Sequence, residues 1–222
     1  GAKVTTTLAM PAAQGLFNKA AVQSGAALRS MTPEEATAYM RKLLAELAVP
    51  ETEVARLQDV PAADLLSAML KITKGMPFGF APVADGRAIP RHQFDPDATP
   101  LAKDIPVIVG YNKDETTILF PRPTDFTLDW DTLKARLEPQ VEDVNVDDVI
   151  AGMRALRPEA TPSDLYWTIT TERSMGRGSY TLASRKAAQD GAPVWIYRME
   201  WETPVMEGRL KSPHALEIPL VF

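Results

Sequence analysis

The segment from Pro106 to Tyr111 (PVIVGY) restricts the fold of this chain more than any other segment. It is a continuous apolar run bounded by Pro and Gly, as expected of a strand that is buried on both faces. Lys19 to Ser24 (KAAVQS), ended by Gly25, and Val194 to Met199 (VWIYRM) are interpreted as two further buried strands. Helical patterns separate the three runs, which indicates an α/β fold with a parallel sheet. Three strands are few for so much helix, so we expect the rest of the sheet to lie outside this sequence.

The clearest helix begins at Thr32, which forms a capping box with Glu35 and precedes Pro33 at the first helical position. Apolar residues then recur at spacings of three and four up to Pro50, and we expect them to face the core: Ala36, Tyr39, Met40, Leu43, Leu44 and Leu47. Other helices are expected over 2–10, 51–58, 61–72 (with Leu65, Leu66, Met69 and Leu70 inward), 131–137 and 146–156, and over a long stretch from 161 to about 189, interrupted at Gly176 and Gly178. Asp85-Gly86 predicts a tight turn.

Composition excludes several classes of protein. The 222 residues fit one domain or a large piece of one, and the 45% hydrophobic content is enough for a core. The formal charge of −5, without a basic stripe, argues against a nucleic-acid partner. No cysteine is present, which excludes disulfides and thiolate chemistry within the chain. No apolar run approaches the roughly 20 residues of a transmembrane helix.

Two histidines and three acids are the candidates for acid–base chemistry. His214 lies on a loop after the third predicted strand, where a general base is often placed, whereas His92 lies in a polar loop and receives no role. Asp114 and Glu115 follow the strand that ends at Tyr111, and either carboxylate is a candidate to orient an imidazole. Glu217 is a third candidate, although an acid three residues from His214 more often braces its own loop.

The sequence offers no nucleophile elbow for these residues to serve. The elbow Gly-x-Ser-x-Gly places serine on a strained turn between a strand and a helix, and no serine here has glycine at both positions. Ser24 lies between Val22 and Ala26 at those positions. The histidines and carboxylates show no metal-ligand spacing, so we expect neither a metal site nor a cofactor.

Five segments, in order along the chain, resemble the type-B carboxylesterase family, which includes bacterial para-nitrobenzyl esterases and the cholinesterases. They are Gly1 to Val4 (GAKV), Pro11 to Gly25 (PAAQGLFNKAAVQSG), Phe80 to Gly86 (FAPVADG), Val109 to Glu115 (VGYNKDE) and Ser212 to Phe222 (SPHALEIPLVF). Two more, Thr161 to Thr171 and Trp201 to Leu210, are similar to bacterial members. The resemblance implies an α/β-hydrolase fold of which residues 1–222 form a part, carrying the strands that position the acid and the histidine.

The resemblance also implies roles for individual residues. Glu115 is implied as the triad acid, His214 as the general base and Ser24 as a hydrogen-bonding residue beside the triad. Met76 and Phe78 match positions that shape the acyl pocket. Gly1 to Val4 is similar to the residues just after the family's elbow, which places the nucleophile three residues upstream of Gly1, so we expect residues 1–222 to be an internal piece of a longer enzyme.

These features predict hydrolysis of small-molecule carboxylic esters through an acyl-enzyme, by a Ser-Glu-His triad whose serine lies outside residues 1–222. We expect these residues alone to be inactive. The alternative is a catalytically inactive, cholinesterase-like binding or adhesion module. Such relatives typically lose triad residues, whereas Glu115 and His214 are both present here.

Overall fold

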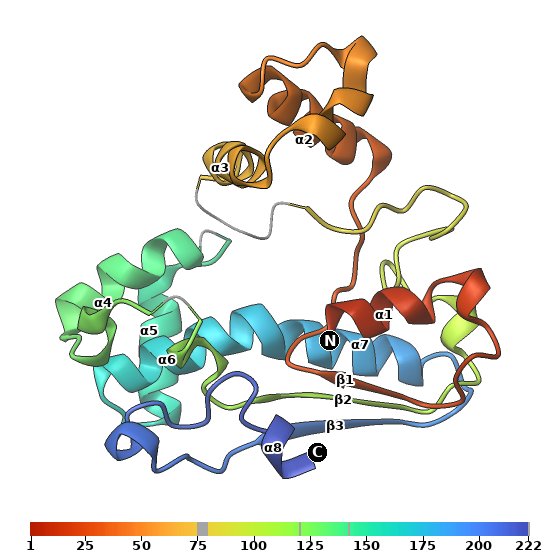
Figure 1. Ribbon diagram of the computed structural model, residues 1–222. Helices are drawn as coiled ribbons and strands as arrows, with labels where there is room; N and C mark the ends of the chain where they lie inside the picture. Colours follow the sequence, from red (N-terminus) through yellow and green to blue (C-terminus); the bar gives the residue numbers. More distant parts are fainter. Residues whose placement is uncertain (75–79, 120, 142, 222) are drawn as a thin grey trace.

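The computed structural model describes residues 1–74, 80–119, 121–141 and 143–221 (Figure 1). A three-stranded parallel sheet with the order β1-β2-β3 forms its centre, and the strands are β1 (Ala20–Gln23), β2 (Val107–Asn112) and β3 (Val194–Met199). The three predicted strands and their parallel pairing are therefore confirmed. β2 extends one residue further than predicted, to Asn112.

Two helices cover one face of the sheet, and they are α1 (Ala2–Leu8) and α7 (Arg177–Ala187) (Figure 1). The side chains between these helices and the sheet are fully buried: Leu8, Val22, Val107, Val109 and Leu182. This apolar layer is the main core of the molecule. It holds the strands in place and thereby fixes the positions of the loops that leave their carboxyl ends.

The opposite face of the sheet is largely uncovered in the part of the chain that the structure describes. Ala21, Ile108 and Trp195 are in register across the three strands, and Ile108 and Trp195 are 42% and 54% exposed. The prediction that β2 is buried on both faces is thus wrong for Ile108, and the prediction that β3 is a buried strand is wrong as well. β3 is hydrogen-bonded only to β2, so it lies at an edge of the sheet where burial is incomplete.

The first helical unit contains α2 (Pro33–Glu46) and α3 (Ala62–Ile72), which stand together above the sheet in Figure 1. The predicted capping box of Thr32 and Glu35 is present, and Leu43 and Leu44 of the predicted stripe are buried. Two details were predicted wrongly. Glu51–Asp59 is a kinked 3-10 helix without buried residues, and Leu66 is 51% exposed because α3 packs only one side against α2.

The second helical unit contains α4 (Trp130–Leu137), α5 (Val146–Leu156) and α6 (Pro162–Thr171). It has a core of its own, built from Leu128, Leu133, Leu137, Val141, Leu165, Tyr166, Trp167 and Ile169. The long helical stretch predicted after residue 161 is confirmed, since α6 continues into α7 through a single π-helical turn at Glu172–Gly176. The predicted interruption at glycine is thus a change of helical pitch and not a break.

Short elements complete the chain. They are the 3-10 turns Pro11–Ala13, Pro100–Ala102, Glu115–Thr117, Pro123–Phe126, Glu138–Gln140 and Val205–Gly208, and the helix α8 (Ile218–Val221). The predicted turn at Asp85-Gly86 is confirmed, because Gly86 has a φ of +75° and the Asp85 carboxylate accepts hydrogen bonds from the backbone of Arg87 and Ile89. Among the helices of the described residues, none has the length and apolarity required to cross a membrane.

Candidate active site

Glu115 is placed by the end of the central strand. It begins a 3-10 turn three residues after the end of β2, and its side chain is fully buried. One carboxylate oxygen, Oε1, accepts a hydrogen bond from the backbone N–H of Asn112 at 2.7 Å. This bond fixes the carboxylate and leaves the second oxygen to face the loop that follows β3.

His214 lies on that loop, and its ring contacts Glu115. The distance between His214 Nδ1 and Glu115 Oε2 is 2.6 Å, and the backbone N–H of His214 also donates to the Glu115 carbonyl at 3.3 Å. Of the three acids that the sequence left open, Glu115 is the one that holds the ring. With Nδ1 engaged, Nε2 of the half-buried ring is the nitrogen free to exchange a proton with a substrate or a nucleophile.

The charge of Glu115 controls the titration of His214. The hydrogen bond to Glu115 raises the pKa of His214 above its ordinary value, burial opposes this rise, and the nearby Glu217 adds to it. The imidazolium form is therefore favoured. A histidine that must accept a proton during a reaction is assisted in the same way, because a buried carboxylate stabilises the charge that develops.

Ser24 and Glu217 belong to a second hydrogen-bonded group, which also lies at the carboxyl ends of the strands. Ser24 follows β1 directly with a φ of +54°, and its hydroxyl donates to Glu217 Oε1 at 3.2 Å. Asn112 Nδ2 donates to Glu217 Oε2 at 2.6 Å and to the carbonyl of Pro213 at 2.7 Å. Glu217 thus braces residues 210–217, which we call the histidine loop, against β1 and β2. This is the local role that its spacing from His214 suggested.

Asn112 was missed by the sequence analysis, although it joins both groups. Its backbone N–H binds Glu115 and its fully buried side chain binds Glu217 and Pro213. A polar residue directly after the apolar run of β2 was the available signal. Such a residue at the carboxyl end of a parallel strand lies where sites in α/β folds gather.

Gly1 lies at this edge as well. A Cβ atom built on Gly1 would come within 1.6 Å of the Gly25 carbonyl oxygen, so the backbone there is packed directly against the residues that follow β1. Gly1 also lies near the carboxylates of Glu115 and Glu217. The beginning of α1 is therefore close to the Glu115–His214 pair.

The remaining candidates lie elsewhere. Met76 and Phe78 fall outside the residues that the structure describes. His92 lines a separate cavity with Thr32 and Asp95. No group of three or more His, Asp or Glu side chains among the described residues is arranged to hold a metal ion.

Comparison with known proteins identifies the family of the chain. The profile of the family described as "Carboxylesterase family" matches residues 1–222. The para-nitrobenzyl esterase of Bacillus subtilis is 33% identical over 227 residues, which cover 100% of this chain and 44% of that protein. The phenmedipham hydrolase of Pseudarthrobacter oxydans is 27% identical over 96% of this chain and 43% of its own length. The chain therefore spans less than half the length of these relatives.

Solved structures give the same result. A carboxylesterase of Geobacillus stearothermophilus superposes with a TM-score of 0.75 at 32% identity, over 98% of this chain and 44% of that one. A para-nitrobenzyl esterase superposes with a TM-score of 0.69 at 31% identity. The parallel sheet and its helices are thus part of an α/β-hydrolase fold. Because the family profile matches residues 1–222 and a relative is 33% identical across the whole chain, this chain belongs to the carboxylesterase family.

Proposed function

We propose that this chain supplies the acid and the base of a serine esterase that hydrolyses carboxylic esters of small molecules. One observation carries the proposal: the buried carboxylate of Glu115 lies 2.6 Å from Nδ1 of His214. The two residues leave the ends of neighbouring strands, 99 positions apart in the sequence. The order acid then histidine is the order of an α/β-hydrolase triad.

The chemistry follows from the free nitrogen of the ring. Nε2 of His214 takes the proton of a serine hydroxyl as its oxygen attacks the ester carbonyl, and Glu115 stabilises the imidazolium that forms. The tetrahedral intermediate collapses when His214 returns the proton to the departing alcohol, which leaves an acyl-serine. Water then attacks the acyl group with His214 again as base, and the acid product and free serine are released.

We further propose that the serine precedes Gly1 in the longer protein, and that residues 1–222 are the part of the α/β-hydrolase domain that follows the elbow. The support is the place of Gly1, which is packed against Gly25 beside Glu115 and Glu217. A residue three positions earlier lies at most about 10 Å away along the chain, within range of the His214 ring. The chain also spans only 44% of the Bacillus relative, so that relative has ample sequence outside the match.

The other candidates take supporting roles in this proposal. Ser24 and Glu217 hold the histidine loop against β1 through the hydrogen bond between them. Because the relatives include a para-nitrobenzyl esterase, an ester whose alcohol part carries a nitrophenyl ring is a suitable first substrate.

The test compares two forms of the protein with p-nitrophenyl acetate. Residues 1–222 alone should hydrolyse no ester above background, because the base has no nucleophile to activate. The longest natural form that contains these residues should turn over, and kcat should fall by about 10³- to 10⁴-fold in Glu115→Gln and at least as far in His214→Ala. His92→Ala, on the other histidine, should leave kcat unchanged.

Two results would contradict the proposal. Turnover by residues 1–222 that disappears in His214→Ala would show that the nucleophile lies within them. A longer natural form that binds esters without hydrolysing them would favour the alternative of an inactive binding module.

A further inference from the structure

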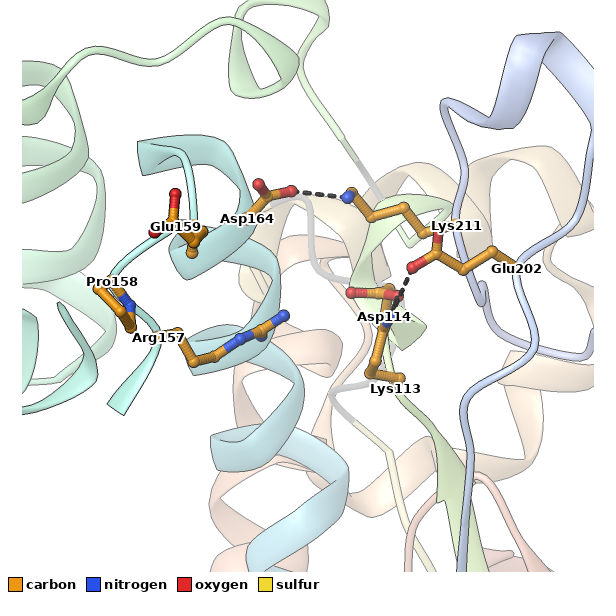
Figure 2. A pocket seen from close by; sticks show the side chains of 9 residues that line it. Lys113, Asp114, Arg157, Pro158, Glu159, Asp164, Glu202 and Lys211 are labelled. Carbon is orange, nitrogen blue, oxygen red and sulfur yellow. Dashed lines mark hydrogen bonds and ion pairs between the residues drawn. The ribbon is translucent and has the colours of Figure 1, made fainter. Parts of the chain in front are cut away.

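A charged cavity of about 330 Å³ lies beside the turn that follows β2, and Lys113 and Asp114 of that turn line it. Figure 2 shows its lining, which comes from that turn, from the segment before α6 and the first turn of that helix, and from the loop after β3. Two ion pairs cross it, Lys113 Nζ to Glu202 Oε1 at 2.5 Å and Lys211 Nζ to Asp164 Oδ1 at 2.6 Å. Asp114 lines the same cavity and is only 2% exposed.

Asp114 forms hydrogen bonds with both backbone groups of one residue in the histidine loop, Ser212. Its backbone N–H donates to the Ser212 carbonyl at 3.0 Å, and its Oδ2 accepts from the Ser212 N–H at 3.2 Å. Ser212 is fully buried and lies two positions before His214. The Asp114 side chain therefore fixes the point from which the loop turns toward Glu115.

The other contacts of the loop do not replace the hydrogen bond between Asp114 and the Ser212 N–H. Thr117 Oγ1 donates to the Leu210 carbonyl at 2.8 Å, which holds the beginning of the loop. The Glu217 contacts hold its end. Among the described residues, Asp114 is the side chain that satisfies the N–H of Ser212, two positions before His214. The neighbouring contacts engage other groups, since Asn112 binds the Pro213 carbonyl and the Ser212 hydroxyl binds the Met199 carbonyl. A buried N–H that loses its acceptor costs about 1–3 kcal/mol, enough to favour a rearranged loop.

We propose that Asp114 is a positioning residue for His214, acting through its hydrogen bond to the Ser212 backbone and not through its charge. The inference rests on the proposed function only for its effect on turnover. The geometric part, that the Asp114 side chain holds residues 210–217 in place, stands by itself. The two adjacent acids of the turn thus have different roles. Glu115 binds the His214 ring, and Asp114 binds the loop that carries the ring.

The surroundings of Asp114 favour a hydrogen-bonding role over an electrostatic one. Burial raises the pKa of Asp114 above its ordinary value, while Lys113, Lys211 and the Ser212 N–H oppose the rise and Glu202 adds to it. Lys113 Nζ is 3.8 Å from Asp114 Oδ2 and closer to Glu202, so the lysine keeps a carboxylate partner without Asp114. Arg157 is directed to Thr168 Oγ1 at 2.5 Å.

The experiment separates geometry from charge with three substitutions, made in the longest natural form of the protein. Asp114→Ala removes the acceptor, Asp114→Asn keeps an acceptor oxygen without the charge, and Asp114→Glu keeps the charge on a longer side chain that the buried site cannot place in the same way. Glu202→Gln is the matched control, because it lines the same cavity without touching Ser212. The two readouts are hydrogen exchange of the peptide that covers residues 210–217 and the pH profile of kcat/KM for p-nitrophenyl acetate.

We expect Asp114→Ala to lower kcat by about tenfold to a hundredfold with little change in KM, since a small misplacement of a catalytic group has effects of that size. The acidic limb of its pH profile should move down toward the ordinary histidine pKa of about 6.5, because the ring is held less well by Glu115. Residues 210–217 should exchange faster. Asp114→Asn and the control should stay within about twofold of the wild type, and Asp114→Glu should resemble Asp114→Ala.

Several results would overturn the inference. It fails if Asp114→Ala leaves exchange and the pH profile unchanged, or if Asp114→Asn is impaired while Asp114→Glu is normal, which would assign the effect to charge. If Asp114→Ala does not fold, the comparison of Asp114→Asn with Asp114→Glu decides the question. If the wild type does not hydrolyse esters, the proposed function fails, and hydrogen exchange alone then tests whether Asp114 holds the loop.

Discussion

The two faces of the sheet are built from alternate residues of the same strands, yet they have different surroundings. On the face under α1 and α7, Val22, Val107 and Val109 are fully buried. On the other face, Ile108 and Trp195 are about half exposed, although the sequence around them is just as apolar. The comparison shows that the burial of a strand residue depends on the layer that covers the strand, and not on the apolar sequence of the strand itself.

The second face is covered only at its carboxyl end in the part of the chain that the structure describes. Asn112 lies on the same face as Ile108 and is fully buried, because Pro213 and Glu217 of the histidine loop lie against it. The contacts that build the site therefore also close this end of the sheet. Three predictions test the difference between three regions: the face covered by α1 and α7, the carboxyl end of the second face that the histidine loop closes (the closed end), and the uncovered remainder of that face.

The largest effect is expected on the covered face. Leu182 of α7 is fully buried in the main core, so Leu182→Ala should lower the free energy of unfolding by about 3 kcal/mol through lost burial and a cavity. Chemical denaturation measures this. Ser184→Ala, at an exposed position of the same helix, is the control and should change stability by less than about 0.5 kcal/mol. Equal effects of the two would show that α7 does not form the core described here.

A smaller effect, dependent on pH, is expected at the closed end. The folded-state pKa of His214 is raised by Glu115, so the pair stabilises the protein fully below the unfolded pKa of about 6.5. This contribution is lost as pH rises through the higher folded-state pKa. The stability advantage of the wild type over Glu115→Gln should therefore shrink from about pH 6 to pH 9.

Denaturation of both proteins across this range measures the pH effect. An advantage that grows with pH would contradict the assignment of the His214–Glu115 bond as the cause.

The smallest effect on stability is expected on the uncovered face. Ile108→Thr keeps a β-branched side chain at a position that is 42% exposed, so the free energy of unfolding should change by less than about 0.5 kcal/mol. Self-association of residues 1–222, measured by sedimentation velocity, should decrease, because an exposed apolar face and open strand edges favour it. A loss of stability like that of Leu182→Ala would mean that this face is buried in solution.

Local signals in the sequence determined the elements well. The apolar run at Pro106 to Tyr111, the capping box at Thr32 and the turn at Asp85-Gly86 all appear where they were predicted. Each depends on contacts between residues close in the chain, so a short window of sequence contains its cause. Where the local signal was weaker, at residues 51–58, a 3-10 helix formed in place of the predicted α-helix.

Tertiary structure decided which residues meet. Residue patterns left Asp114, Glu115 and Glu217 open as partners of His214, and only the resemblance to a known family implied Glu115. The choice of Glu115 depends on the register of β2 against β3 and on the loop that Ser212 and Asp114 hold, and the bond between Ser24 and Glu217 joins residues 193 positions apart. The exposure of Ile108 and Trp195 could likewise not be predicted from the sequence. The residues of a strand specify an apolar face, whereas other segments of the fold determine whether that face is covered.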